Sequence, residues 1–360
     1  MSADVKLVAS GTRAPVGTTA ESVAAAVRAG ISRVRRLLVP ELGGQSDSFI
    51  ARDALLDPRE WRGATRMAVL GAGALAEVIA KLAPALTPWN VEVPVLVGLP
   101  EERPGWKSAD TSQVVAALAA VGSERLRLRV EPRLTGHASA LEGLQDAVTR
   151  VGRAARTPLV IVGGVDSYID IQTLAWLRER NQWLEEGART GFAPGEAAAF
   201  VAVMAAPDAR RLGLAPHATL RTVATAHETR LIHTPDINLG EGLTAAVSQA
   251  LAPTNGTRER VENIHCDING ERYRSEEWGF VALRLGAAFR DASAVHTPVS
   301  RCGEVGAATG ALNLVLCAQA WRRRYARGPR ALLWGSSENG LRAAALLEEP
   351  LPQSEGGIHP

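Results

Sequence analysis

Lysine and cysteine are scarce in this chain of 360 residues, which contains three of each. The cysteines, Cys266, Cys302 and Cys317, form no CxxC pair, which argues against a disulfide framework and favours a reducing compartment. No uninterrupted apolar run reaches the roughly 18 residues of a membrane span, and the first residues, MSADVKLVAS, lack the apolar core of a signal peptide. We therefore expect a cytoplasmic protein with no membrane partner.

An excess of charge of one sign is also missing. The 40 basic and 38 acidic residues leave a formal net charge of +2, so the chain has no basic footprint for nucleic acid. Apolar residues make up 46% and charged residues 22%, which is ordinary for a globular protein and excludes a disordered or collagen-like chain. Histidine and cysteine nowhere adopt the spacing of a zinc site, so we expect neither a metal nor a cofactor.

Strand-like and helical segments alternate along the chain, which is typical of a layered α/β fold with helices over mostly parallel strands. Two segments, Gly136–Ser167 and Gly303–Glu338, echo each other. Each combines a small-residue entry, an amphipathic helix, an arginine-rich turn with proline, and an apolar strand that ends at glycine or serine. This repeat predicts two similar halves packed against each other.

Five motifs, in order along nearly the whole chain, resemble the β-ketoacyl synthases, the condensing enzymes of the thiolase superfamily. They are VASGTRAPVGTTAESVAAAVRAGISRV, LVIVGGVDSYID, GFAPGEAAAFVAVMA, GEVGAATGALNLVL and LLWGSSENGLRAAALLE. The resemblance implies a thiolase-like α/β fold of five layers, α-β-α-β-α, built from two pseudo-duplicated halves and usually dimeric. We expect an N-terminal half over residues 1–206, a C-terminal half over residues 207–350 and a flexible tail over residues 351–360.

The nucleophile implied by the resemblance is missing from this chain. A condensing enzyme needs a cysteine thiolate at the N-terminus of the nucleophile helix, where the helix dipole lowers its pKa. The family's spacing places this residue near Ala138, between His137 and Ser139, and no cysteine occurs in the first half. The family's lysine position falls at Val299 or Ser300.

The two histidines that assist decarboxylation and stabilise the enolate in the family are replaced as well. The first falls at Asp267, in a turn that also contains Asn269, and the second falls at Glu304, two residues after Cys302. Two carboxylates in these places would repel a developing enolate. We call His137, Ala138, Ser139, Asp267, Asn269, Cys302 and Glu304 the vestigial pocket, and predict that it does not condense.

Two residues of the vestigial pocket are alternative nucleophiles. Ser139 could act with His137 as its base, but its place three residues before Glu142 favours a helix cap, and residues two apart at a helix start do not face each other. Cys302 lies beside Arg301, which could lower the pKa of its thiol. Because no histidine nearby in the sequence could orient it, a small semi-buried residue is the better interpretation.

Asp267 and Glu304 could instead form a carboxylate pair that does acid/base work. Pairing with arginines such as Arg272 or Arg301 is the commoner fate of acidic residues in a chain this rich in arginine.

Two further patterns have both a functional and a purely structural interpretation. The stretch Gly71–Ala76 imitates a dinucleotide-binding turn, but residues 67–86 read better as one alanine-rich buried helix. Trp176 and Trp183, seven residues apart after Asp170, would share one face of a helix and form either a partner-binding stripe or an ordinary packing contact.

The sequence therefore predicts a β-ketoacyl synthase-like protein that has lost condensing chemistry and serves as a binding or assembly partner. The resemblance suggests a chain-length-factor-like subunit in a homo- or heterodimer, or an accessory protein of type VI secretion that binds an effector. The competing hypothesis is an enzyme, an acyltransferase or decarboxylase that acts on thioesters of acyl carrier protein or coenzyme A through a remodelled pocket.

Overall fold

The computed structural model describes residues 4–37, 48–86, 90–153, 159–232, 234 and 236–351. Apart from Leu351, the predicted flexible tail lies outside the described residues. The predicted boundary after residue 206 stays a prediction, although it coincides with the end of one set of strands.

Ten strands make up the body of the molecule, in the order β10-β9-β11-β12-β8-β1-β7-β6-β4-β5. The first set in the chain is β1 (Val5–Arg13), β4 (Val91–Gly98), β5 (Leu126–Arg133), β6 (Leu159–Ser167) and β7 (Glu196–Ala205). The second is β8 (Ala218–His227), β9 (Asn263–His265), β10 (Val295–His296), β11 (Arg330–Ser336) and β12 (Leu341–Glu348). Within each set the spatial order is third, second, fourth, fifth, first, and the fifth strand is antiparallel to both neighbours. The shared order confirms the predicted pseudo-duplication.

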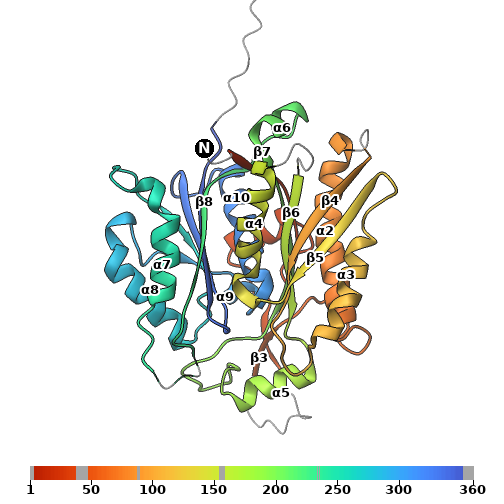
Figure 1. Ribbon diagram of the computed structural model, residues 1–360. Coiled ribbons are helices and arrows are strands. Elements are labelled where there is room, and N and C mark those ends of the chain that lie inside the picture. Colours follow the sequence, from red (N-terminus) through yellow and green to blue (C-terminus); the bar gives the residue numbers. More distant parts are fainter. Residues whose placement is uncertain are drawn as a thin grey trace, which may run out of the picture.

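Helices complete the five layers (Figure 1). Between the two sets of strands lie α4 (Ser139–Arg153) and α10 (Thr309–Arg322). The outer face of the first set is covered by α2 (Gly63–Leu86) and α3 (Thr111–Ala119), and that of the second by α7 (Glu241–Ala250) and α8 (Arg272–Leu285). The α-β-α-β-α order confirms the predicted fold. The shorter helices are α1 (Ala20–Arg28), α5 (Ile171–Glu179), α6 (Ala206–Arg211) and α9 (Val299–Cys302), with 3₁₀ turns η2 (Ser108–Asp110), η3 (Gly136–Ala138), η4 (Ala252–Thr254), η5 (Gly286–Ala288) and η6 (Gly306–Ala308).

The predicted buried helix over residues 67–86 is α2, whose long run of alanine and leucine packs on β1 and β7. By length and composition it is the one helix among the described residues that could cross a membrane. Its residues Leu70, Leu75, Val78 and Leu82 are fully buried against the protein, which identifies it as a core helix. Because Gly71–Ala76 lies inside this helix and follows no strand, it does not form a dinucleotide-binding turn.

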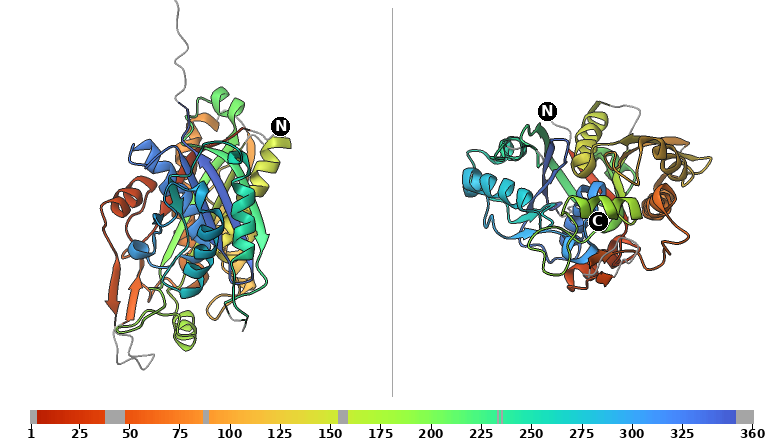
Figure 2. Two further views of the ribbon diagram at one scale, coloured as in Figure 1. Left: turned by 90° about the vertical axis from the view of Figure 1, so that its left-hand side faces the viewer. Right: turned by 90° about the horizontal axis from the view of Figure 1, so that it is seen from below.

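The two sets of strands are joined by an antiparallel pairing of β1 with β8, in which Lys6 lies opposite Thr219. On its other side β8 pairs with β12, where Thr219 lies opposite Glu348. A separate two-stranded sheet, β2 (Val34–Leu37) with β3 (Ser48–Ala51), extends toward α5 at one end of the molecule (Figure 2).

Of the two interpretations of Trp176 and Trp183, the structure supports packing and not a partner-binding stripe on one helix face. The helix there, α5, ends at Glu179, so Trp183 lies in the following loop. Its side chain is buried, and its indole N–H donates to the carbonyl oxygen of Phe49 at 2.8 Å. Trp176 is half-buried, with the guanidinium of Arg180 over its ring. These two tryptophans therefore share no exposed surface.

Candidate functional site

The vestigial pocket lies where the two halves of the fold meet. The 3₁₀ turns η3 and η6 open the two central helices, and each begins with a glycine in the left-handed region, Gly136 with φ 67° and Gly306 with φ 49°. The two turns pack together, and Gly164 of β6 comes so close to η6 that an added Cβ would lie 2.1 Å from the carbonyl oxygen of Ala307. Backbone contact of this kind fixes the two helix starts relative to each other.

The side chain that enters the site from η3 is that of His137. Its Nε2 lies 3.2 Å from Oε1 of Glu304 and 3.3 Å from a terminal nitrogen of Arg274. Ala138, which the family's spacing indicated, is buried with the apolar core instead. The position facing the site is thus one residue earlier than predicted, and an imidazole occupies it.

Arg274 of α8 fills the space between the residues predicted to replace the two histidines. Its guanidinium donates to Asp267 at 2.7 Å, to Glu271 at 3.1 Å and to the carbonyl oxygen of Ser336 at 2.7 Å. The guanidinium and both carboxylates are at least nine-tenths buried. Asp267 is therefore held by an arginine, as expected of acids in this chain, but by neither Arg272 nor Arg301.

Glu304 completes the cluster from the other side. One of its carboxylate oxygens accepts from Nδ2 of Asn269 at 2.7 Å, and the other accepts from the backbone N–H of Gly306 at 2.8 Å. Glu304 and Asp267 thus bind different cations, His137 and Arg274. We call His137, Asp267, Asn269, Glu271, Arg274 and Glu304 the central cluster.

The remaining predicted residues do not join this cluster. The cap predicted for Ser139 is wrong, because its buried Oγ has no hydrogen-bond partner and Glu142 instead accepts from Oγ1 of Thr135 at 2.7 Å. Cys302 ends α9 among apolar core residues, where burial raises the pKa of its thiol to about 12. A thiol held in this way is no nucleophile at neutral pH.

The backbone at the start of η3 and α4 is also satisfied internally. The N–H of Ala138 donates to Oγ of Ser337 at 2.9 Å, and that hydroxyl donates in turn to the carbonyl oxygen of Thr135. A backbone N–H can stabilise an oxyanion only if it points at the place where the oxyanion develops. Here Ser337 occupies that direction.

The charges of the cluster are mutually dependent. Burial disfavours the carboxylate of Glu304, but His137, Arg274 and the Gly306 N–H outweigh this and lower its pKa to about 2. Burial and Arg274 likewise oppose a proton on His137, yet Glu304 and Asp267 overcome both and raise its pKa. For Asp267 burial dominates and raises the pKa despite Arg274. The surroundings therefore favour an ionised Glu304 and a proton on His137, whereas burial of Asp267 opposes the charge that pairs with Arg274.

A small cleft among the described residues leads to His137. It has a volume of about 70 Å³, far below the roughly 300–1,000 Å³ of ordinary ligand sites, and is lined by Glu101, Arg103, Asp166, Trp176 and Glu338 among others. Arg103 pairs with Asp166 at 2.5 Å and closes one side. Burial raises the pKa of Glu101.

We expect the free energy of unfolding to decrease above neutral pH because of His137. Because its pKa is raised on folding, the stabilisation is complete below the unfolded value of about 6.5 and is lost as pH rises through the folded pKa. Urea unfolding between pH 6 and pH 8, below the range in which unfolded cysteines ionise, should show this decline, and His137→Gln should remove it. The matched control is His217→Gln, because burial lowers the pKa of His217 to about 4 and both states are neutral above pH 6.5. A decline unchanged in His137→Gln would contradict the assignment.

Arg274 and Glu271 were missed by sequence reasoning. They are three residues apart at the start of α8, where the sequence reads Glu271-Arg-Tyr-Arg274 and offers Arg272 as an equally good partner. The choice depends on how α8 is turned: Arg272 points to solvent and pairs with Glu276, whereas Arg274 points inward. Helical spacing from the buried Trp278 and Val281 was the one signal that could have found Arg274.

No family model matches the sequence, and no curated protein matches it either. Solved structures do match in three dimensions. The ishigamide ketosynthase/chain length factor superposes with a TM-score of 0.79 at 15% identity, over 97% of this chain and 100% of that one. A type II PKS acyl-carrier protein in complex with its ketosynthase gives 0.77 at 15%, over 97% and 100%. The ketosynthase from module 6 of the bacillaene synthase of Bacillus subtilis 168 gives 0.75 at 12%, over 97% and 72%. From end to end of its described residues, this chain has the thiolase-like fold of the ketosynthases and chain length factors.

Proposed function

We propose that this protein is a non-condensing ketosynthase-fold subunit that binds a partner, in the manner of a chain length factor. The observation that carries this proposal is the guanidinium of Arg274, which lies with His137, Asp267 and Glu304 where a condensing enzyme needs space and a nucleophile. A site filled by its own ion pairs leaves no room for an acyl group.

The chemistry of the cluster supports the same conclusion. All three cysteines are buried, and burial raises the pKa of each thiol, so none supplies a thiolate. Asp267 and Glu304 carry the wrong charge to stabilise an enolate. The His137–Glu304 pair could exchange a proton with a group in the cleft, but the cleft is too small for a thioester arm. Acyl transfer is therefore the second candidate, and the experiment below tests both.

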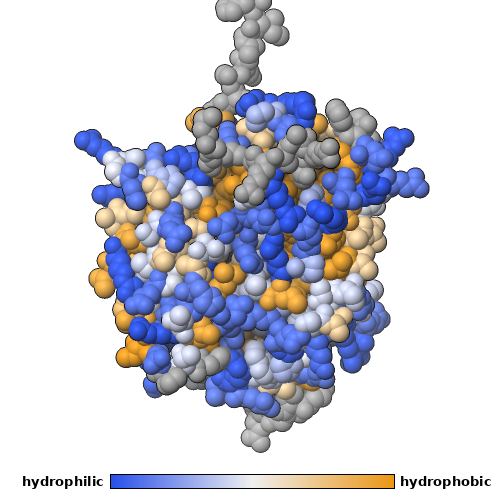
Figure 3. Space-filling view, viewed as in Figure 1, coloured by the Kyte–Doolittle hydropathy of each residue, from blue (hydrophilic) through white to orange (hydrophobic). Residues whose placement is uncertain are grey.

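Assembly with a partner is supported by the surface. β5 ends the strand order and pairs only with β4 among the described residues, which leaves one row of its backbone groups open to another strand. Beside it, the face that carries α4 shows a polar column flanked by apolar areas (Figure 3). We infer that this face meets a second ketosynthase-fold subunit. Binding of a secretion effector instead would be an outcome of the test.

We expect no acyl adduct when the protein is incubated with malonyl- or acyl-loaded carrier protein and its intact mass is measured. The control is any active ketosynthase under the same conditions, which should gain the acyl mass. An adduct that disappears in Ser139→Ala or Cys302→Ala would overturn the non-condensing assignment. Co-purification from the native host should recover a stoichiometric ketosynthase-fold partner, whereas a homodimer without any partner would contradict the heteromeric proposal.

A further inference from the structure

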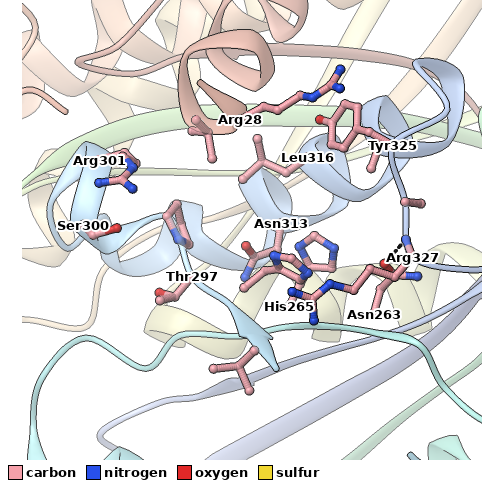
Figure 4. Close-up of a pocket in the computed structure, with 16 residues that line it drawn as sticks. Arg28, Asn263, His265, Thr297, Ser300, Arg301, Asn313, Leu316, Tyr325 and Arg327 are labelled. Carbon is pink, nitrogen blue, oxygen red and sulfur yellow. Dashed lines mark hydrogen bonds between the residues drawn. The ribbon is translucent and has the colours of Figure 1, made fainter. Parts of the chain in front are cut away.

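A second and much larger cavity is lined by none of the residues of the central cluster (Figure 4). Its volume is about 440 Å³, and it shares no lining residue with the cleft beside His137. Its walls come from α1, α10, β9, β10, the residues of α9 and the loop after α10. A volume of this size is within the range of sites for small organic ligands.

The floor of this cavity is buried and partly unsatisfied. Asn313 and Leu316 of α10 form one part of it and His265 of β9 forms another, and each of the three is less than a tenth exposed. Oδ1 of Asn313 and Nδ1 of His265 have no hydrogen-bond partner among the described residues. Buried polar atoms without a partner are rare in native proteins, and a bound ligand or water commonly supplies it.

The rim is cationic. Arg28, Arg301 and Arg327 come from three different segments (Figure 4), and no carboxylate is among the described residues that line the cavity. Arg28 lies over the ring of Tyr325 at 4.4 Å, but none of these three guanidiniums forms an ion pair within the part of the chain that the structure describes. Arg28 and Arg327 are exposed and Arg301 is half-buried, so all three guanidiniums are accessible to a ligand.

The field inside the cavity is correspondingly positive. Together with burial, the charge of Arg327 lowers the pKa of His296, whose ring stacks on that of His265 with 5.1 Å between centroids. Arg327 also lines a neighbouring cavity with Glu262 and Asp291, so its side chain lies between the two cavities. Glu262 is itself paired with Arg330 at 3.0 Å. An anion entering the larger cavity would therefore meet three arginines that form no ion pair among the described residues, of which Arg327 also faces two acids.

We propose that this cavity binds a small organic anion, with a phosphate or carboxylate head group against Arg327 and an apolar body over Leu316. The planar guanidinium matches both head groups through paired hydrogen bonds. The apolar lining, which includes Val27, Val295, Pro298 and Ala320, favours a ligand with a hydrophobic part over a bare inorganic ion. This site is independent of the proposed assembly function.

Titration calorimetry with four probes tests this proposal: phenyl phosphate, benzoate, inorganic phosphate and phenol. Phenyl phosphate or benzoate should bind at one site, and the stronger of the two identifies the head group. Inorganic phosphate should bind at least about tenfold more weakly because it lacks the apolar body, and phenol should not bind because it lacks the charge. Equal binding of phenol and phenyl phosphate, or no binding of either anion, would overturn the proposal.

Two variants locate the site. Arg327→Ala should weaken binding of the preferred anion by about tenfold or more, as expected for loss of a charge-assisted hydrogen bond, whereas Arg301→Ala, at the opposite end of the cavity, should weaken it by less. Both side chains lie at the rim, so the fold should tolerate either change, and circular dichroism verifies this. The matched control is Arg323→Ala, an exposed arginine at the end of α10 outside the cavity, which should leave the affinity unchanged. If Arg323→Ala lowered the affinity by the same factor, the effect would come from the overall charge of the protein, and the proposed site would be refuted.

Discussion

Replacing Arg274 with alanine is expected to destabilise the protein by about 3–5 kcal/mol, the typical result of removing one partner from a buried ion pair. The substitution leaves Asp267 and Glu271 buried without the guanidinium that neutralises them. It also leaves the carbonyl oxygen of Ser336 without its hydrogen-bond donor. Protonation of the carboxylates would relieve part of this penalty, so the loss should be larger at pH 8 than at pH 5. Equilibrium unfolding in urea at the two pH values measures both effects.

A control for this substitution lies two residues away on the same helix. Arg272 pairs with Glu276 at 2.5 Å, but its side chain is 81% exposed. Surface pairs of this kind contribute about 0–1 kcal/mol, so Arg272→Ala should change the stability very little. If Arg274→Ala and Arg272→Ala cost the same, the ion pairs of Arg274 would contribute no more to stability than a surface pair.

Gly164→Ala is the second substitution expected to be strongly destabilising. It should lower the free energy of unfolding by about 3 kcal/mol or more. The added methyl group would lie 2.1 Å from the carbonyl oxygen of Ala307 and 3.0 Å from Cα of Ala308. These are backbone atoms of η6, so no flexible side chain can move aside, and the two halves would have to separate at their junction. Thermal and urea unfolding should both show the loss.

A glycine-to-alanine substitution in α8, Gly279→Ala, should instead stabilise the protein. Gly279 is exposed, and nothing lies within 4 Å of an added Cβ. Alanine at an exposed helical position is favoured over glycine by roughly 0.5–1 kcal/mol. A stable Gly164→Ala variant, alongside the expected gain in Gly279→Ala, would mean that β6 and η6 are not in rigid contact.

The sequence was sufficient to predict the fold because its signals are local and repeated. The segments Gly136–Ser167 and Gly303–Glu338 occupy equivalent places, each with a 3₁₀ turn, a central helix and the fourth strand of its set. Small residues at Gly136, Gly164 and Gly306 are needed where backbones approach or φ is positive, so the motif and the geometry have the same cause.

The site was predicted only in outline. Asp267, Asn269 and Glu304 do converge, as the resemblance implied. The inward residue of η3 was misplaced by one position, because the turn, and not the helix register, decides which side chain enters. Arg274 and Glu271 were not predicted, because the sequence offers Arg272 and Arg274 two residues apart and the rotation of α8 about its axis decides which of them faces inward.

The pairing of β8 with both β1 and β12 brings the first and the last of the described strands close together. Thr219 lies opposite Lys6 on one side and Glu348 on the other, so a single strand separates β1 from β12, a distance of about 10 Å. A short linker from a residue near Glu348 to a residue near Lys6 would therefore close the described backbone into a ring. A circular permutant that starts at an exposed turn would then keep the same neighbours for every strand.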